Sequence, residues 1–333
     1  MYSYISHISE ELNCEDFVKF VGQSDFEKNV AEEHKAILNK PVHGTFKESQ
    51  KSENAILNRF KYPNCFDHSR VVLSSEKKRN NYINANYVDG YNHPKKFICM
   101  QAPMHHTNYD LWRTVWMNHS RIIVMLCEKS VFNYKNYDAY WFHLKGTLKC
   151  EKFEIKTKTI DVQSTHVLTI LEVTDGTTAT QEVLHFAFTT WPDKELPSSV
   201  EDFLNFVLAV RHSDNEIKAR LTQKGCQEYS PPIIVHSKMG VERSAAFCAI
   251  DIELSRYNVT GIISLASTVA QIREQRHNSL SNVDYYLFCY RVLAKYVNLF
   301  HWGKIPLLKP TTSHVVSLIK KVSVPKFFNF KNN

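Results

Sequence analysis

A short apolar strand runs directly into a long apolar helix in the last third of the sequence, and this junction constrains the fold more than any other feature. Residues 231–235 are Pro-Pro-Ile-Ile-Val, and the segment 236–257 follows at once. This order predicts a buried strand, a tight turn and a long buried helix. Such a turn directs backbone N–H groups and the positive end of the helix dipole at one point, where an anion binds. Arg243 stands at the start of the helix, where its guanidinium can grip phosphate, although many purely structural turns share this pattern.

Helical and strand patterns on either side of this junction indicate the rest of the fold. The first forty residues repeat apolar side chains at helical spacing, beginning with Ile8, Leu12 and Phe17, which predicts two short leading helices. Residues 82–191 carry short runs of β-branched and aromatic side chains. These runs predict a set of strands, interrupted by one helix near residues 111–119.

Helices return after the strands. Ser199–Asp202 has the spacing of a capping box ahead of an amphipathic segment, and two further helical patterns follow through Leu265 and Tyr286. No linker or internal repeat divides the body. We therefore expect a single domain of the α/β (α+β) class, with a large mixed sheet flanked by helices.

Composition excludes several classes of function. The chain has 333 residues but only nine glycines, and neither dinucleotide-binding nor P-loop glycine motifs occur. The eight cysteines are scattered without a C-x-x-C pair, which predicts buried reduced thiols, and the sixteen histidines form no H-E-x-x-H motif. We expect neither a cofactor nor a metal. The longest apolar runs, such as Ile122–Leu126, are too short to span a membrane.

The positive charge is concentrated at the C-terminal end. The chain carries 41 Lys and Arg against 34 Asp and Glu, but residues 303–333 contain six lysines and no acidic residue, which leaves 35 against 34 elsewhere. A nearly neutral body is a poor match to a nucleic-acid-binding protein. The basic tail has two interpretations: a solvated disordered segment, or an arm that makes weak contact with anionic membranes or a partner.

Several segments resemble the motifs of the protein tyrosine phosphatase family, in the family's order. VHSKMGVERSA (235–245) is similar to its signature loop, V-H-C-x-x-G-x-x-R-[ST], and TTWPDKELP (189–197) to its mobile W-P-D loop. NRFKYPNCFDHSRVVL (58–73) resembles its phosphotyrosine-recognition segment. YINANYVDGY (82–91) and FICMQAPMHHTNYDLWRTVW (97–116) resemble two further family segments. The divergent sequence is most similar to the tyrosine phosphatases of bracoviruses, which parasitoid wasps carry.

The resemblance implies a tyrosine-phosphatase domain with a highly twisted mixed sheet and a phosphate-binding loop between a strand and a helix. It also implies a role for individual residues. The nucleophile position is Ser237, the general acid position is Asp193, and Arg243 grips phosphate. The phosphate-binding loop comprises Lys238, Met239, Gly240, Val241, Glu242 and Arg243. The substrate-binding positions are Phe60, Tyr62, Ser281 and Tyr285.

Ser237 occupies the place at which the family has its nucleophilic cysteine. A cysteine thiol has a pKa near 8.5, which a cradle of N–H groups and a helix dipole can lower enough to ionise it. A serine hydroxyl is far more basic and needs an adjacent general base. His236 precedes it, but the family directs this histidine away from the nucleophile. We therefore expect a loop that binds phosphate without attacking it.

Other departures from the family pattern favour natural loss of activity over a laboratory Cys-to-Ser change. Glu242 places a carboxylate where the family usually has Gly, and its charge opposes a phosphate unless it points outward or pairs with Lys238. Tyr62 replaces an aspartate that bonds the substrate main chain. Ser281 and Tyr285 replace two glutamines of the water-positioning segment.

Two hypotheses of different classes follow. The first is a catalytically inactive homologue that binds phosphotyrosine proteins or scaffolds signalling partners. The second is an active or slow phosphatase, with Ser237 either functional or an engineered replacement.

We expect an N-terminal helical segment over 1–22, the phosphatase-like domain over 23–302 and the basic tail over 303–333. The start of the chain lacks a secretory h-region, which predicts a cytoplasmic protein. We also expect a monomer. If the bracovirus resemblance holds, that cytoplasm is the host cell's, and the protein modulates signalling in host immune cells.

Overall fold

The structure is a computed structural model, and it describes residues 11–62, 64–74, 79–126, 139–192, 195–223 and 230–301. Its strands are β1 (Leu12–Asn13), β2 (Arg70–Val72), β3 (Tyr82–Gly90), β4 (His93–Gln101), β5 (Ile122–Leu126), β6 (Gly146–Cys150), β7 (Phe153–Val162), β8 (His166–Thr174), β9 (Thr180–Phe188), β10 (Ile233–Ser237) and β11 (Ile262–Ile263). Its α-helices are α1 (Cys14–Val21), α2 (Phe26–Asn39), α3 (Asn108–Met117), α4 (Val200–Gln223), α5 (Arg243–Thr260), α6 (Leu265–Gln275) and α7 (Val283–His301). Two 3-10 helices cover Ser52–Leu57 and His105–Thr107.

Within these ranges, nine strands form one mixed sheet in the order β2-β3-β4-β10-β5-β9-β8-β7-β6. The central strand β10 runs parallel to both neighbours, with Ile234 paired to Ile98 of β4 and to Ile123 of β5. Every residue of β10 is buried, as expected for a strand covered on both faces. The expected fold class is therefore confirmed.

The central strand begins and ends two residues later than the sequence pattern indicated. Pro231 and Pro232 have no backbone N–H to donate, so regular pairing starts at Ile233. At the other end, His236 and Ser237 continue the parallel pairing with β4. The strand thus extends as far as the predicted phosphate-binding loop.

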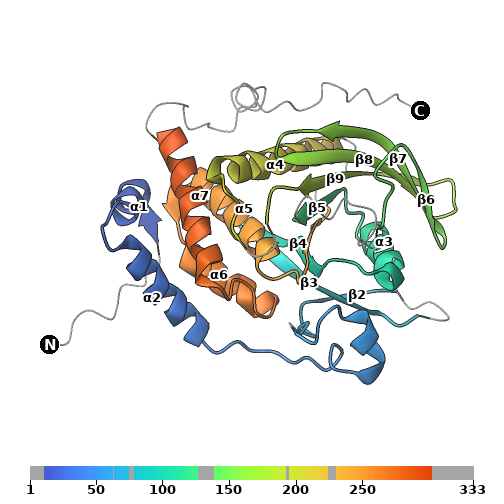
Figure 1. Cartoon of the computed structure of the whole chain (residues 1–333), viewed down its shortest axis with the longest axis horizontal. Coiled ribbons are helices and arrows are strands. Elements are labelled where there is room, and N and C mark those ends of the chain that lie inside the picture. Colours follow the sequence, from blue (N-terminus) through green and yellow to red (C-terminus); the bar gives the residue numbers. More distant parts are fainter. Residues whose placement is uncertain are drawn as a thin grey trace.

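Helices cover both faces of the sheet and form two hydrophobic cores (Figure 1). Alternation along β4 shows the division: Phe97 and Cys99 contribute to the core under α4, α5, α6 and α7, whereas Ile98 and Met100 contribute to the core under α3. The six cysteines that can be assessed are all free. No helix in the described part of the chain combines the length and apolar character that a bilayer crossing requires.

The two leading helices are present, but the first begins later than expected. Leu12 belongs to β1, which pairs with Ile263 of β11, and Asn13 then caps α1 by accepting a hydrogen bond from the Asp16 N–H. Ile8 lies outside the described residues. Leu12, which the helical spacing assigned to the first helix, therefore belongs to a strand pairing instead.

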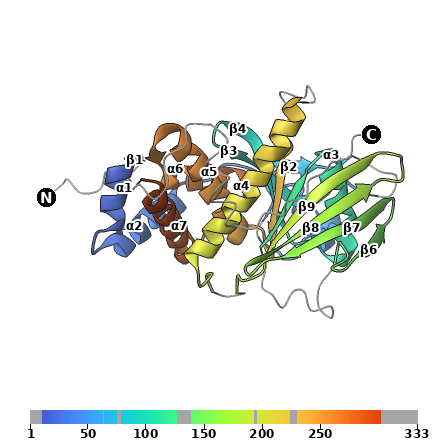
Figure 2. The ribbon, with the colours of Figure 1, turned by 90° about the horizontal axis from the view of Figure 1, so that it is seen from above.

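Helices α1 and α2 pack on the last helix, α7. Tyr290 of α7 stacks on Phe17 at 6.1 Å between ring centroids, and its hydroxyl donates a hydrogen bond of 2.7 Å to Glu33 of α2. Figure 2 shows α1, α2, α6 and α7 gathered at one end of the molecule and strands β6–β9 extending from the other. Residues 303–333, the predicted tail, lie outside the described residues.

Candidate active site

The loop between β10 and α5 carries the predicted phosphate-binding residues. Ser237 ends the strand, Arg243 begins the helix, and Gly240 between them closely approaches Met100 of β4. Gly240 has φ +70°, and a Cβ at this position would lie 2.1 Å from the carbonyl oxygen of Met100. Both the left-handed conformation and the close approach to β4 require glycine here.

A buried arginine from outside the loop holds it in place. Arg276, just after α6, donates through Nε to the Gly240 carbonyl at 3.2 Å and through Nη2 to the Met239 carbonyl at 3.3 Å. Its Nη1 donates to Asn86 Oδ1 of β3 at 2.8 Å. Sequence reasoning missed Arg276, because its partners lie 36 or more positions away and no local pattern marks it.

Ser237 is buried, and its hydroxyl has two close partners. Its Oγ lies 3.0 Å from Ser244 Oγ and accepts a hydrogen bond of 3.2 Å from the Gly240 N–H. Neither partner is a base at neutral pH. The loop thus surrounds a neutral hydroxyl with hydrogen-bonding groups.

The neighbouring histidine is directed away from this hydroxyl. His236 Nε2 lies 2.7 Å from the Tyr140 hydroxyl, which lies 2.7 Å from His185 Nε2 on its other side. Nδ1 of His236 is buried and has no hydrogen-bond partner among the described residues. Burial, helped by the positive charge of Arg59, lowers the pKa of His236 to about 3. His236 is therefore neutral, and neither ring nitrogen bonds Ser237.

Arg243 connects the loop to the segment before the predicted general acid. Its Nη2 donates a hydrogen bond of 2.7 Å to the Pro192 carbonyl, and the guanidinium lies 5.8 Å from the centre of the Trp191 ring. The side chain is buried at the N-terminus of α5. Asp193 itself lies outside the described residues.

Glu242 is directed toward Ser281. Its Oε1 accepts hydrogen bonds from the Ser281 N–H, at 3.1 Å, and from the Ser281 hydroxyl. Burial raises the pKa of Glu242, while the hydrogen bonds from Ser281 and the Asn282 N–H oppose that rise. Tyr285 stacks on Trp191 at 5.7 Å with 17° between the ring planes. Ser281 and Tyr285 are thus brought to the edge of the loop.

The two remaining predicted substrate-binding residues are exposed on a segment that is anchored beside the loop. Phe60 and Tyr62 are 38% and 54% exposed. The preceding Arg59 donates through Nε to the Ala102 carbonyl at 3.2 Å, and the Ala102 N–H donates to the Ser237 carbonyl at 2.8 Å. Lys238 and Met239 are exposed on the loop itself. Within the described ranges, no group of three His, Cys, Asp or Glu side chains could hold a metal ion.

Comparison with known proteins gives consistent matches. The model of the protein-tyrosine phosphatase family matches residues 54–295. Tyrosine phosphatase H2 of Microplitis demolitor bracovirus (isolate Webb) is 47% identical over 291 residues, covering 86% of this chain and 89% of that protein. Tyrosine phosphatase-like protein J1 of the same virus is 37% identical over 294 residues, covering 88% and 98%. Mouse tyrosine-protein phosphatase non-receptor type 9 is 28% identical over 292 residues, covering 86% of this chain and 49% of the mouse protein.

Proposed function

The chain belongs to the protein-tyrosine phosphatase family, and from this premise we propose that it binds phosphotyrosine proteins in the β10–α5 loop without hydrolysing them. The observation that carries the proposal is the surroundings of Ser237: its hydroxyl lies at the start of the β10–α5 loop, and no base bonds it among the described residues. The family's reaction begins with transfer of the phosphoryl group to a nucleophile. A hydroxyl that keeps its proton cannot accept the phosphoryl group.

The chemistry of the loop explains why sulfur and oxygen differ here. Backbone N–H groups and a helix dipole can lower the pKa of a thiol, which starts near 8.5, by several units. The same groups cannot ionise an alcohol, which needs a base within hydrogen-bond reach. The nearest candidate, His236, is engaged by Tyr140 instead.

Three features support retention of phosphate binding. Arg243 is held at the N-terminus of α5, where its charge and the helix dipole both attract an anion. Gly240 keeps the loop in the left-handed turn that aims its N–H groups. The Glu242 carboxylate is bonded by Ser281, which draws it toward the α6–α7 connection.

Binding is tested by calorimetric titration with a phosphotyrosine peptide and its unphosphorylated form. We expect saturable binding of the phosphopeptide alone, lost in Arg243→Ala and retained in Arg220→Ala, a matched change on the distant end of α4. Absence of binding at millimolar peptide would reject capture and leave scaffolding through the protein surface.

Catalytic loss is tested by Ser237→Cys. We expect little phosphate release from an aryl phosphate even with the thiol restored, because Ser281 and Tyr285 stand at the water-positioning sites. Strong activity in Ser237→Cys would instead indicate that only the nucleophile had been changed.

A second candidate function is a slow phosphatase that uses Ser237. The observation in its favour is that relatives such as H2 and non-receptor type 9 are named phosphatases. Phosphate release by the unmodified chain that is lost in Asp193→Ala would establish this alternative.

The bracovirus relatives also motivate a proposed setting. We place the protein in the cytoplasm of a host cell, where it modulates immune-cell signalling by occupying phosphotyrosine proteins. Expression in insect immune cells, followed by affinity capture with the parent chain and with Arg243→Ala, tests this setting. Recovery of the same proteins by both would refute it.

A further inference from the structure

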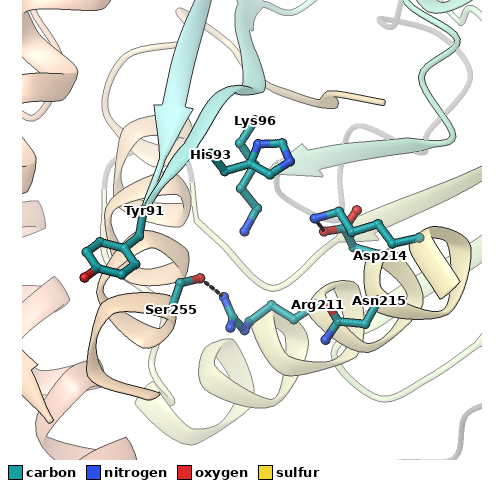
Figure 3. A pocket seen from close by; sticks show the side chains of 8 residues that line it. Tyr91, His93, Lys96, Arg211, Asp214, Asn215 and Ser255 are labelled. Carbon is teal, nitrogen blue, oxygen red and sulfur yellow. Dashed lines mark hydrogen bonds and ion pairs between the residues drawn. The ribbon is translucent and has the colours of Figure 1, made fainter. Parts of the chain in front are cut away.

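A polar pocket lies away from the β10–α5 loop, between α4, α5 and the β3–β4 hairpin (Figure 3). Its volume is about 140 Å³, well above the roughly 10–15 Å³ that one water molecule requires. Asp251, which pairs with the lining residues Lys96 and Arg211, follows Arg243 by eight residues along α5. At a rise of 1.5 Å per residue this separation is about 12 Å, so the pocket is distinct from the candidate active site.

The pocket is lined by more positive than negative charge. Lys96 of β4 and Arg211 of α4 both form ion pairs with Asp251, and Lys218 of α4 pairs with Asp214 at 2.7 Å. These five groups leave one net positive charge. Lys96, Arg211 and Asp251 are largely buried, so their charges are screened less than they would be in water.

The guanidinium of Arg211 is held so that part of it remains available. Among the described residues, Nη1 donates every hydrogen bond of the Arg211 side chain. The acceptors are the Asp251 carbonyl and Oδ1, at 2.8 and 2.7 Å, and Ser255 Oγ at 2.9 Å. Figure 3 shows the bond to Ser255. Nε and Nη2 make no hydrogen bond to another described residue and are not among the fully buried, unpaired nitrogen and oxygen atoms, and the side chain is 17% exposed. The side chain is thus fixed by one nitrogen while two N–H-bearing atoms stay accessible.

Two further polar groups of the pocket have no hydrogen-bond partner within the described ranges. Nδ1 of His93 is buried and unpaired. Asn215 is exposed beside Arg211, and its amide makes no bond to another described residue. Figure 3 shows both side chains at the pocket with Arg211. The Asn215 amide and the Arg211 guanidinium can donate hydrogen bonds beside a net positive charge, which indicates a ligand that accepts hydrogen bonds.

We propose that this pocket is a second anion site, which binds a small oxyanion of the phosphate type. One edge of the Arg211 guanidinium offers two parallel donors, the geometry that matches two oxygens of phosphate. Lys218 and the Asn215 amide complete the contacts at the rim. The opposing groups are two carboxylates: Asp214, whose charge is offset by Lys218, and Asp251, whose charge is offset by Lys96 and Arg211.

The proposal is tested by calorimetric titration of the full chain with inorganic phosphate in the Arg243→Ala background, which removes the loop's grip. We expect binding to remain and to weaken on the order of tenfold when Lys218→Glu or Asn215→Asp is added. Lys28→Glu, an equal charge change on exposed α2, is the matched control and should leave the affinity unchanged.

Two results would overturn the second site: no binding in the Arg243→Ala background, or binding that neither pocket substitution weakens. If the parent chain and Arg243→Ala bound phosphate equally, that result would count against phosphate binding by the β10–α5 loop. The same result would support the pocket if Lys218→Glu then weakened phosphate binding. The two proposals can therefore fail separately.

Discussion

Gly240→Ala tests the geometry of the predicted phosphate-binding loop against a matched glycine elsewhere. Gly240 and Gly261 have nearly the same backbone conformation, with φ +70° and +73°. They differ in surroundings: a Cβ at Gly261 meets nothing within 4 Å, whereas one at Gly240 would lie 2.1 Å from the Met100 carbonyl oxygen and 2.7 Å from the Gln101 nitrogen. The pair separates backbone strain from steric overlap.

The expected magnitudes follow from this difference. Alanine in the left-handed region costs about 1–2 kcal/mol, so Gly261→Ala should lower the free energy of unfolding by about that amount. Gly240→Ala carries the same strain, and the loop or β4 must also move by about 1 Å to restore van der Waals contact. Overpacking of this kind costs about 1–3 kcal/mol, which gives a total of about 2–5 kcal/mol.

The two variants are compared by urea unfolding and by titration with a phosphotyrosine peptide. We expect Gly240→Ala to be the less stable and to lose peptide binding, because its loop N–H groups are displaced. Gly261→Ala should bind as the parent does. Equal loss of stability in the two variants would refute the reasoning that contact with β4 confines position 240 to glycine.

Three further predictions concern buried polar groups. Asp251→Asn should lower the free energy of unfolding by about 3–5 kcal/mol at pH 7, because it leaves Lys96 and Arg211 without their countercharge. In contrast, Asp25→Asn, at an exposed position just before α2, should have little effect. Burial would raise the pKa of Asp251, but the charges of Lys96 and Arg211 outweigh burial and hold this pKa at about 2 instead of 3.8. The ionised carboxylate therefore stabilises the folded state fully above about pH 4. This stabilisation is lost as the pH falls toward 2. A difference between parent and Asp251→Asn that stayed constant from pH 5 to pH 2.5 would contradict this. Arg276→Met should cost about 2–4 kcal/mol and weaken phosphopeptide binding, because it frees the Met239 and Gly240 carbonyls; chemical denaturation and calorimetry measure both, and unchanged binding would count against its positioning role. Tyr140→Phe should cost about 2–3 kcal/mol in thermal unfolding by leaving two buried imidazole nitrogens unpaired, and a loss below about 0.5 kcal/mol would show that the hydroxyl is dispensable.

Features that are local in the chain were predictable from sequence. The strand–turn–helix around Ser237 follows from consecutive residues, and the capping residue Ser199 accepts a hydrogen bond from the Asp202 N–H as its spacing predicts. The major strands between residues 82 and 188 also follow from their side-chain types. In each case the signal lies in a few consecutive residues.

Features that depend on distant residues were not predictable. Strands β2 and β6 are short, carry no distinctive apolar run, and form only the edges of the sheet. Arg276 acquires its role through carbonyl groups on another element. The second pocket joins Lys96, Arg211 and Asp251 from a strand and two helices, so no stretch of sequence contains its pattern.

The position of β10 has a consequence for biosynthesis. This strand joins a half-sheet made by residues 70–101 to another made by residues 122–188, yet Ile233 is 107 positions beyond Leu126. At about 5–20 residues per second, a ribosome needs roughly 5–20 s to produce that stretch. Until then the inner edges of β4 and β5 have no partner and can pair with another nascent chain. Truncation before Ile233 should therefore yield two unjoined half-sheets prone to aggregation, and chaperones would be needed most in the interval before β10 emerges.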